Sequence, residues 1–225
     1  MDNTIYLNNS KQLLMLTLAK IDGAYAPTTI RAYREDFIDF IKYSESIDRC
    51  ALPADSQTIS GFIEHLIKRN KKSASIRRAI AGISSIHSLS GERDPTKETD
   101  VRLALRRMHR QLGRYSHQAL GLTKQKLEEM LTVTDDSLRG YRDRALLMTA
   151  YDTLCRRSEL LSLHAEDIDE QLINNTRTMV ILLRRSKTDQ DAQGKWLAIS
   201  QNTAEAIIDW LNKSNIDPTP IFRAI

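Results

Sequence analysis

The spacing of apolar residues is the strongest constraint on this fold, and it changes partway along the chain. Up to residue 112, apolar side chains recur at helical spacing in four stretches, which contain Ile30, Ile59, Ile76 and Val101. Each stretch predicts an amphipathic helix with one buried face. Together with a leucine-rich segment at 13–18, the pattern indicates a compact bundle of about five helices.

The starts of two of these helices are predicted from residues that favour N-cap positions. Thr28 or Thr29 is expected to cap the helix that contains Ile30, and Ser73 or Ser75 is expected to cap a later one. Hydroxyl oxygens at these positions can accept hydrogen bonds from the free N–H groups of a first helical turn.

Residues 113–121 carry two glycines and no apolar period, which is typical of a linker between domains. Beyond them, helical patterns alternate with two apolar, β-branched runs that flank a polar turn, which predicts a hairpin. The expected helices are 123–131, 138–151, 156–163 and 203–211, and the expected strands are 178–184 and 195–199. The fold is therefore predicted to be mainly α, with a helical domain at 1–113, a linker at 114–121, and an α+β region at 122–225 with a small antiparallel sheet.

Composition argues against several other classes of protein. The two cysteines, Cys50 and Cys155, lie far apart and match no metal-ligand spacing, so we expect no metal and no cofactor. No apolar run approaches the length of a membrane span, and the first residues lack the layout of a signal peptide. The sequence thus predicts a cytoplasmic protein with reduced thiols and no membrane partner.

Positive charge is concentrated in one part of the chain. Residues 61–114 contain 13 Lys/Arg and 5 Asp/Glu, a balance of +8, whereas residues 115–225 contain 14 and 16, a balance of −2. Such a segment fits contact with a polyanion such as double-stranded DNA, although a solvated basic face is the alternative. The candidate DNA-binding residues lie off the apolar stripes of the predicted helices: Arg31, Arg34, Ser75, Arg77, Arg78, Arg106, Arg107 and Arg110.

A motif at 151–160, Tyr-Asp-Thr-Leu-Cys-Arg-Arg-Ser-Glu-Leu, carries the most specific signal. It resembles the first arginine motif of the tyrosine recombinases of the phage-integrase type, and of their Cre-like members in particular. The resemblance implies that Arg156 is a catalytic arginine and that Glu159 supports it. Without the resemblance, Arg156 would be interpreted as a helix-start arginine paired with Glu159 three residues on.

The resemblance extends to other parts of the chain. Arg-Arg-Ser-Lys-Thr at 184–188 is similar to the family's hairpin turn, which makes Lys187 the candidate catalytic lysine; otherwise it would be a solvated turn residue. Segments at 28–33, 75–78, 86–91 and 101–107 are similar to helices of the family's core-binding domain, a SAM-like bundle. An arginine fork can bind two phosphoryl oxygens, and a lysine can protonate the leaving oxygen, so this chemistry needs no metal.

The family's later parts, a His-x-x-Arg motif and the tyrosine nucleophile, are not found after Arg156 in these 225 residues. The chain is therefore expected to be a C-terminally truncated recombinase, with an incomplete catalytic domain, that binds duplex DNA without cleaving it. The resemblance implies that the full-length parent recombines or integrates DNA at an inverted-repeat site as a homo-tetramer. Two alternatives are a non-catalytic DNA-binding module or regulator derived from a recombinase, and a helix-turn-helix transcription factor.

Overall fold

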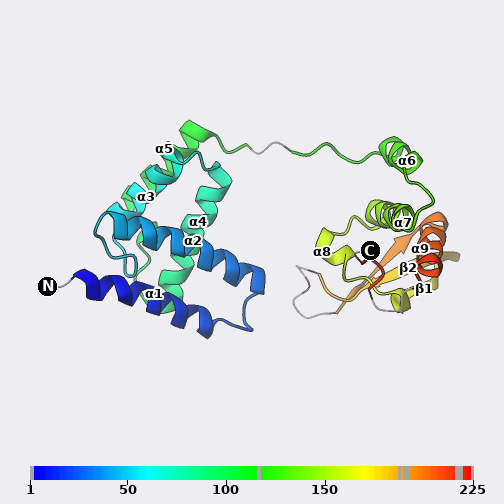
Figure 1. Cartoon of the computed structure of the whole chain (residues 1–225), viewed down its shortest axis with the longest axis horizontal. Helices are drawn as coiled ribbons and strands as arrows, with labels where there is room; N and C mark the ends of the chain where they lie inside the picture. The colour runs from blue at the N-terminus through cyan, green and yellow to red at the C-terminus, as the bar shows by residue number, and fades with distance from the viewer. Residues whose placement is uncertain (1–2, 116–117, 187–188, 190–192, 216–219, 224–225) are drawn as a thin grey trace. The chain divides into compact units, whose positions relative to one another are not determined.

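The computed structural model describes residues 3–115, 118–186, 189, 193–215 and 220–223. The chain divides into two compact units, Met1–Gln118 and Ala119–Ile225 (Figure 1). The first unit is helical, and the second combines helices with a three-stranded sheet. Each unit has its own hydrophobic core.

The first unit is built from helices around an aromatic and isoleucine-rich core. Helix α2 packs against α1 and α4, and α3 packs against α5. Phe37, Phe40 and Phe62 are fully buried where α2 meets α3, with the rings of Phe40 and Phe62 5.1 Å apart. The elements are α1 Asn3–Lys20, α2 Pro27–Ser46, α3 Ser56–Lys68, α4 Ser73–Ser90, the 3-10 turn η1 Pro95–Lys97 and α5 Thr99–Leu112.

Two predicted helix caps are wrong. Helix α2 begins at Pro27 with Ala26 as its N-cap, and Thr28 and Thr29 lie inside its first turn. Proline suits the first helical position because its φ is already helical and it has no N–H to satisfy. Helix α4 begins one residue after Lys72, so neither serine caps it either.

The second unit packs α7 against α9, and the antiparallel sheet has the strand order β1-β2-β3. Its core includes Ala145, Ile181, Ile207 and Trp210, all with no measurable exposure. The elements are α6 Lys124–Thr132, α7 Leu138–Thr153, α8 Arg157–Leu160, η2 Ala165–Asp167, β1 Ile168–Ile173, β2 Thr176–Leu183, β3 Lys195–Ile199 and α9 Gln201–Ser214.

Strand β1 has no counterpart among the strands predicted from apolar runs. None of its six residues is fully buried, so its sequence does not alternate as a half-buried strand should. It is joined to β2 through Asn174 and Asn175, which both have positive φ, at 51° and 62°. Consecutive positive-φ residues suit the tight turns whose twist matches a hairpin, and asparagine tolerates them well.

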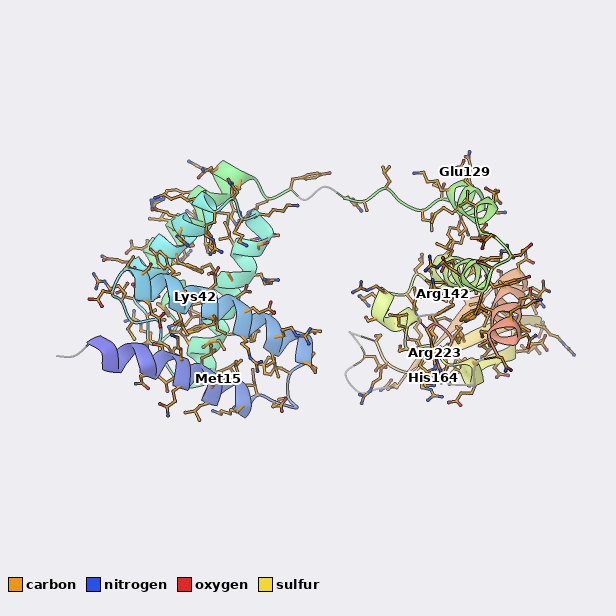
Figure 2. All side chains as sticks on the ribbon, in the orientation of Figure 1. Met15, Lys42, Glu129, Arg142, His164 and Arg223 are labelled. Carbon is orange, nitrogen blue, oxygen red and sulfur yellow. The ribbon has the colours of Figure 1, made fainter. Side chains whose placement is uncertain are left out.

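Residues 220–223 pack onto this same unit. Pro220 forms an isolated antiparallel bridge with His164, and the Ile221 N–H donates to the Leu163 carbonyl at 2.8 Å. The indole N–H of Trp210 donates to the Ile221 carbonyl at 2.7 Å. These buried contacts fix residues 220–223 on the unit, and Figure 2 labels His164 and the neighbouring Arg223.

Candidate DNA-binding surface and active-site residues

The exposed face of α5 forms an open, basic groove. Arg106, Arg107 and Arg110 point away from the buried side of the helix, which carries Val101, Ala104 and Met108. The groove, of about 780 Å³, is lined by Leu103, Arg106, Arg107, His109, Arg110 and Arg114. Among the residues that the structure describes, no acidic side chain forms an ion pair with the three predicted arginines, so their guanidinium groups are available to a ligand.

Arg77 of α4 belongs to the same basic region. The Ser73 hydroxyl at the start of α4 lies 3.3 Å from Nδ1 of His109 on α5. The pKa of His109 is lowered, first by its partial burial and then by the positive charges of Arg114 and Arg77. A pocket lined by Lys71, Lys72 and Arg114 also joins the start of α4 to the end of α5, so the two helix ends share one positive surface.

Arg78, the next residue of α4, is instead held by an acid. Its Nε donates to Oδ2 of Asp36 on α2 at 2.9 Å, and its Nη2 donates to Oδ1 at 2.8 Å. The pKa of Arg78 is raised, chiefly by the hydrogen bonds that it donates to Asp36. Ser75 is exposed and lines a small cleft beside this pair. Ser75 and Arg78 therefore lie close together on α4. The carboxylate of Asp36 lies beside them and links Arg78 to α2.

Arg31 and Arg34 are exposed on α2, but they do not lie beside Arg78. Each helical residue turns the chain by about 100°, so Arg34 points roughly 160° and Arg31 roughly 140° away from Asp36. Because Asp36 faces α4, the two arginines lie on a different side of α2. The eight predicted residues therefore form two groups, one shared by α4 and α5 and one on the far side of α2.

Arg156 and Glu159 form a fixed unit at the start of α8. The backbone N–H of Arg156 donates to Oε2 of Glu159 at 2.8 Å, and its Nη1 donates to Oε1 at 2.8 Å. The Glu159 side chain is 9% exposed, whereas that of Arg156 is 57% exposed. A buried carboxylate thus anchors both the backbone of Arg156 and one nitrogen of its guanidinium, and the Arg156 side chain itself is more than half exposed.

Lys187, the predicted catalytic lysine, lies outside the described residues. On one side of it, Arg184 forms an ion pair with the buried Asp167, with Nε and Oδ2 2.8 Å apart, and a second with Glu166. On the other side, the Gly194 N–H donates to the Asp189 carboxylate at 2.9 Å. These contacts anchor the ends of the turn that joins β2 to β3.

Replacing Glu159 with glutamine is expected to lower the free energy of unfolding of the second unit by about 2 kcal/mol. The Gln amide would turn an N–H toward an Arg156 donor, leaving one buried group unsatisfied. Chemical denaturation measures this. Glu166→Gln is the control, because Glu166 is 55% exposed and its loss should cost under about 1 kcal/mol. Equal effects of the two substitutions would contradict the anchoring role of Glu159.

Two kinds of site are not found in the part of the chain that the structure describes. No three His, Cys, Asp or Glu side chains there are arranged to hold a metal ion. No described helix is long and apolar enough to span a membrane.

The sequence pattern missed several residues that shape the basic surface. Asp36, His109 and Arg114 were not among the predicted site residues, yet one holds Arg78 and the others line the groove on α5. Arg114 could have been found from its place at the end of the basic segment. No local signal marks Asp36, because its partner lies 42 residues further along the chain.

Comparison with known families identifies both units. The model of the phage integrase family matches residues 121–222, and that of the phage integrase N-terminal SAM-like domain matches residues 16–89. Both matches fall on elements already described, and the first includes Arg156 and Glu159. The chain belongs to the tyrosine recombinase family, also called the phage integrase family, as the motif at 151–160 predicted.

Individual relatives agree with this assignment. The chain is 28% identical over 229 residues to an integrase/recombinase XerD homolog of Selenomonas ruminantium, a match that covers 97% of this chain and 66% of the relative. It is 24% identical to the recombinase Cre of Escherichia phage P1, covering 75% of this chain and 50% of that protein. The chain thus spans between half and two thirds of the length of these relatives.

The fold is shared with a solved structure of the Tn1549 transposon integrase in complex with transposon right end DNA. The TM-score is 0.60 at 13% sequence identity, and the match covers 94% of this chain and 71% of the other. This likeness bears out the predicted fold class, a helical bundle followed by helices with a small antiparallel sheet.

Proposed function

We propose that this chain provides the DNA-binding surface and part of the phosphoryl-transfer site of a site-specific recombinase. The observation that carries the proposal is the Arg156–Glu159 pair, an exposed guanidinium fixed by a buried carboxylate within the region that matches the integrase family. A phosphodiester under attack gathers negative charge on its oxygens, and a pre-oriented guanidinium stabilises that charge without having to reorganise.

In this proposal the two parts of the chain have different roles. Residues 1–113 bind duplex DNA, residues 114–121 are a linker, and residues 122–225 form the first part of the catalytic domain. Arg77, Arg106, Arg107 and Arg110 contact phosphates, since each is exposed and without an ion pair among the described residues. Arg31 and Arg34, on another side of α2, add a second contact.

The chemistry of the site is assigned in the same way. Arg156 binds the scissile phosphate, Glu159 orients Arg156, and Lys187 donates a proton to the leaving 5′-oxygen. No metal and no cofactor takes part in this proposal. The full-length parent would act in the cytoplasm on an inverted-repeat site, as a tetramer. The family assignment supports these roles, and the Tn1549 integrase was solved with DNA bound.

The DNA-binding part is tested by reversing one unpaired charge. Arg77→Glu should weaken binding to a random-sequence duplex about tenfold at low salt, and should make the salt dependence of log affinity shallower by about one. The reason is the loss of one phosphate contact and of the counterion release that accompanies it. Fluorescence anisotropy across a salt series measures both quantities.

Arg93→Glu is the matched control, because Arg93 is exposed just beyond the opposite end of α4 and pairs with Glu98. It makes the same change in net charge and should leave affinity and salt slope close to those of the original chain. If both variants weaken binding alike, only net charge matters, and the proposed surface on α4 and α5 is wrong.

A further inference from the structure

Arg78 differs in its bonding from the other arginines of the basic surface. Its Nε and Nη2 both donate to Asp36, so one whole side of the guanidinium plane is occupied. The Asp36 side chain is 13% exposed and that of Arg78 is 61% exposed, so the carboxylate is sheltered while the guanidinium reaches into solvent. The planar group is thus held in one orientation.

This side-on contact leaves the end of the guanidinium free. Two N–H groups, one on Nη1 and one on Nη2, project in parallel away from the chain. Parallel donors of this kind match two neighbouring acceptors, and in the major groove O6 and N7 of guanine form such a pair. A phosphate group offers a similar pair of oxygens, but the nearby negative charge of Asp36 disfavours a phosphate at this place.

A second described arginine paired with an acid on α2 does not share this geometry. Arg69 contacts both oxygens of Asp39 through Nη1 alone, at 2.9 Å each, so its guanidinium has no occupied side edge. Arg77 has no carboxylate partner among the described residues. Arg142 and Arg184 of the second unit also donate to an aspartate through Nε and Nη2, but among the described arginines of the first unit this side-on arrangement is found at Arg78.

The place of Arg78 in the fold also suits contact with bases. It lies in the second turn of α4, and the exposed residues one turn before it, Ala74 and Ser75, have small side chains. Small side chains allow a helix end to approach a groove closely. Helices that enter the major groove commonly contact base edges from their N-terminal turns.

We propose that Arg78 is a specificity-determining residue that reads a guanine in the major groove of the target site, and that Asp36 is its positioning residue. This inference rests on the proposed DNA-binding function and goes beyond it, because it assigns base readout to one side chain and phosphate contact to its unpaired neighbours. Asp36 would fix the guanidinium before DNA arrives, which reduces the entropy lost on binding.

Selection from a randomised duplex library with the 225-residue chain tests the proposal. The original chain should enrich duplexes that share a G·C pair at one position. Arg78→Gln should lose that preference about tenfold while keeping the preferences at other positions. Arg78→Lys, which keeps the charge but has no planar fork, should lose it as well.

Asp36→Asn should weaken the preference at that same position and raise affinity for random duplex, because it frees the guanidinium and removes a negative charge. Glu45→Gln is the matched control: it lies on the same helix and also loses an ion pair, with Lys11. It should select the same sequences as the original chain. A purely structural role of Asp36 would not change one base position alone.

The outcomes separate this inference from the function it rests on. If the original chain binds no duplex at low salt, the proposed DNA-binding function fails. If it binds but enriches no common G·C pair, or if Arg78→Gln and Arg78→Lys select the same sequences as the original chain, the role of Arg78 is wrong. If the two Arg78 variants change the selected sequences but Asp36→Asn does not, Asp36 is not the positioning residue of Arg78.

Discussion

Gly140→Ala is expected to destabilise the second unit by about 3 kcal/mol, although the same substitution in an open helix position would stabilise it. Alanine is favoured over glycine inside helices by about 1 kcal/mol. At residue 140, however, a Cβ atom would overlap the carbonyl oxygen of Asp135 and lie 2.8 Å from its carbonyl carbon. Backbone atoms cannot rotate aside, so the loop before α7 would have to move.

That loop is also held by hydrogen bonds that its movement would break. The Gly140 N–H donates to the Ser137 hydroxyl at 3.1 Å, which caps α7. The Ser137 N–H in turn donates to the Asp135 carboxylate at 3.2 Å, and hydrogen bonds from Ser137 lower the pKa of Asp135. The alanine therefore costs both packing and a helix cap, which is worth about 1 kcal/mol by itself.

Gly121→Ala is the control for this prediction, because no atom lies within 4 Å of the Cβ position there. It should change the free energy of unfolding by less than about 1 kcal/mol, and the sign should favour alanine. Urea denaturation followed by tryptophan fluorescence measures both variants, because Trp196 and the buried Trp210 both belong to the second unit. A neutral or stabilising Gly140→Ala would contradict the close approach of α7 to residue 135.

Local periodicity predicted the parts of the fold that depend on it. The stripes through Ile30, Ile59, Ile76 and Val101 become α2 to α5, because a helix that buries one face must place apolar residues three or four apart. The same reasoning did not predict strand β1, because its residues are largely exposed and carry no apolar period.

The candidate site was predicted less completely, and for a different reason. Arg156 and Glu159 are three residues apart, so their contact lies within reach of a local motif. Asp36 and Arg78 are brought together only by the packing of α2 on α4, and nothing near either residue in the sequence marks the other. Arg31 and Asp36 likewise lie on different sides of α2. Which side of α2 faces α4 depends on packing, and a count of charges along the sequence does not reveal it.

A second large effect is expected at His87, a buried histidine that was not among the predicted site residues. Its Nε2 accepts from the Ala54 N–H at 3.1 Å, so this nitrogen carries no proton, and Nδ1 donates to the Ile83 carbonyl at 2.8 Å. The neutral imidazole thus ties α4 to the segment before α3. His87→Phe should cost about 3 kcal/mol at pH 7.5, because it leaves the Ala54 N–H without its partner.

The same contact makes the first unit sensitive to acid. Burial lowers the pKa of His87, and its bond to Ile83 and the charges of Asp94 and Glu92 oppose that shift without cancelling it. In the unfolded chain His87 binds a proton at about pH 6.5, whereas in the folded chain it does so only at a lower pH. The free energy of unfolding therefore falls as the pH drops below about 6.5. The expected slope approaches about 1.4 kcal/mol per pH unit.

Asp94 does not obscure this effect, because it titrates in a different pH range. Burial alone would raise its pKa, but hydrogen bonds from Ser84 and Thr96 outweigh burial and lower it, so the stability that Asp94 contributes is lost only as the pH falls below about 4. Between pH 7.5 and pH 5 the loss of stability should therefore come from His87 and from His109, whose pKa is lowered as well.

Urea denaturation at pH 7.5 and pH 5 tests this with two variants of α4. His87→Phe should be much less stable than the original chain at pH 7.5. It should lose less stability than the original chain at pH 5, because only His109 still contributes its share, so the two stabilities converge. Ile83→Val, one turn away in the same core, should cost about 1 kcal/mol equally at both values, because it changes no titrating group. Parallel curves for the original chain and His87→Phe would mean that His87 is not the acid-sensitive group.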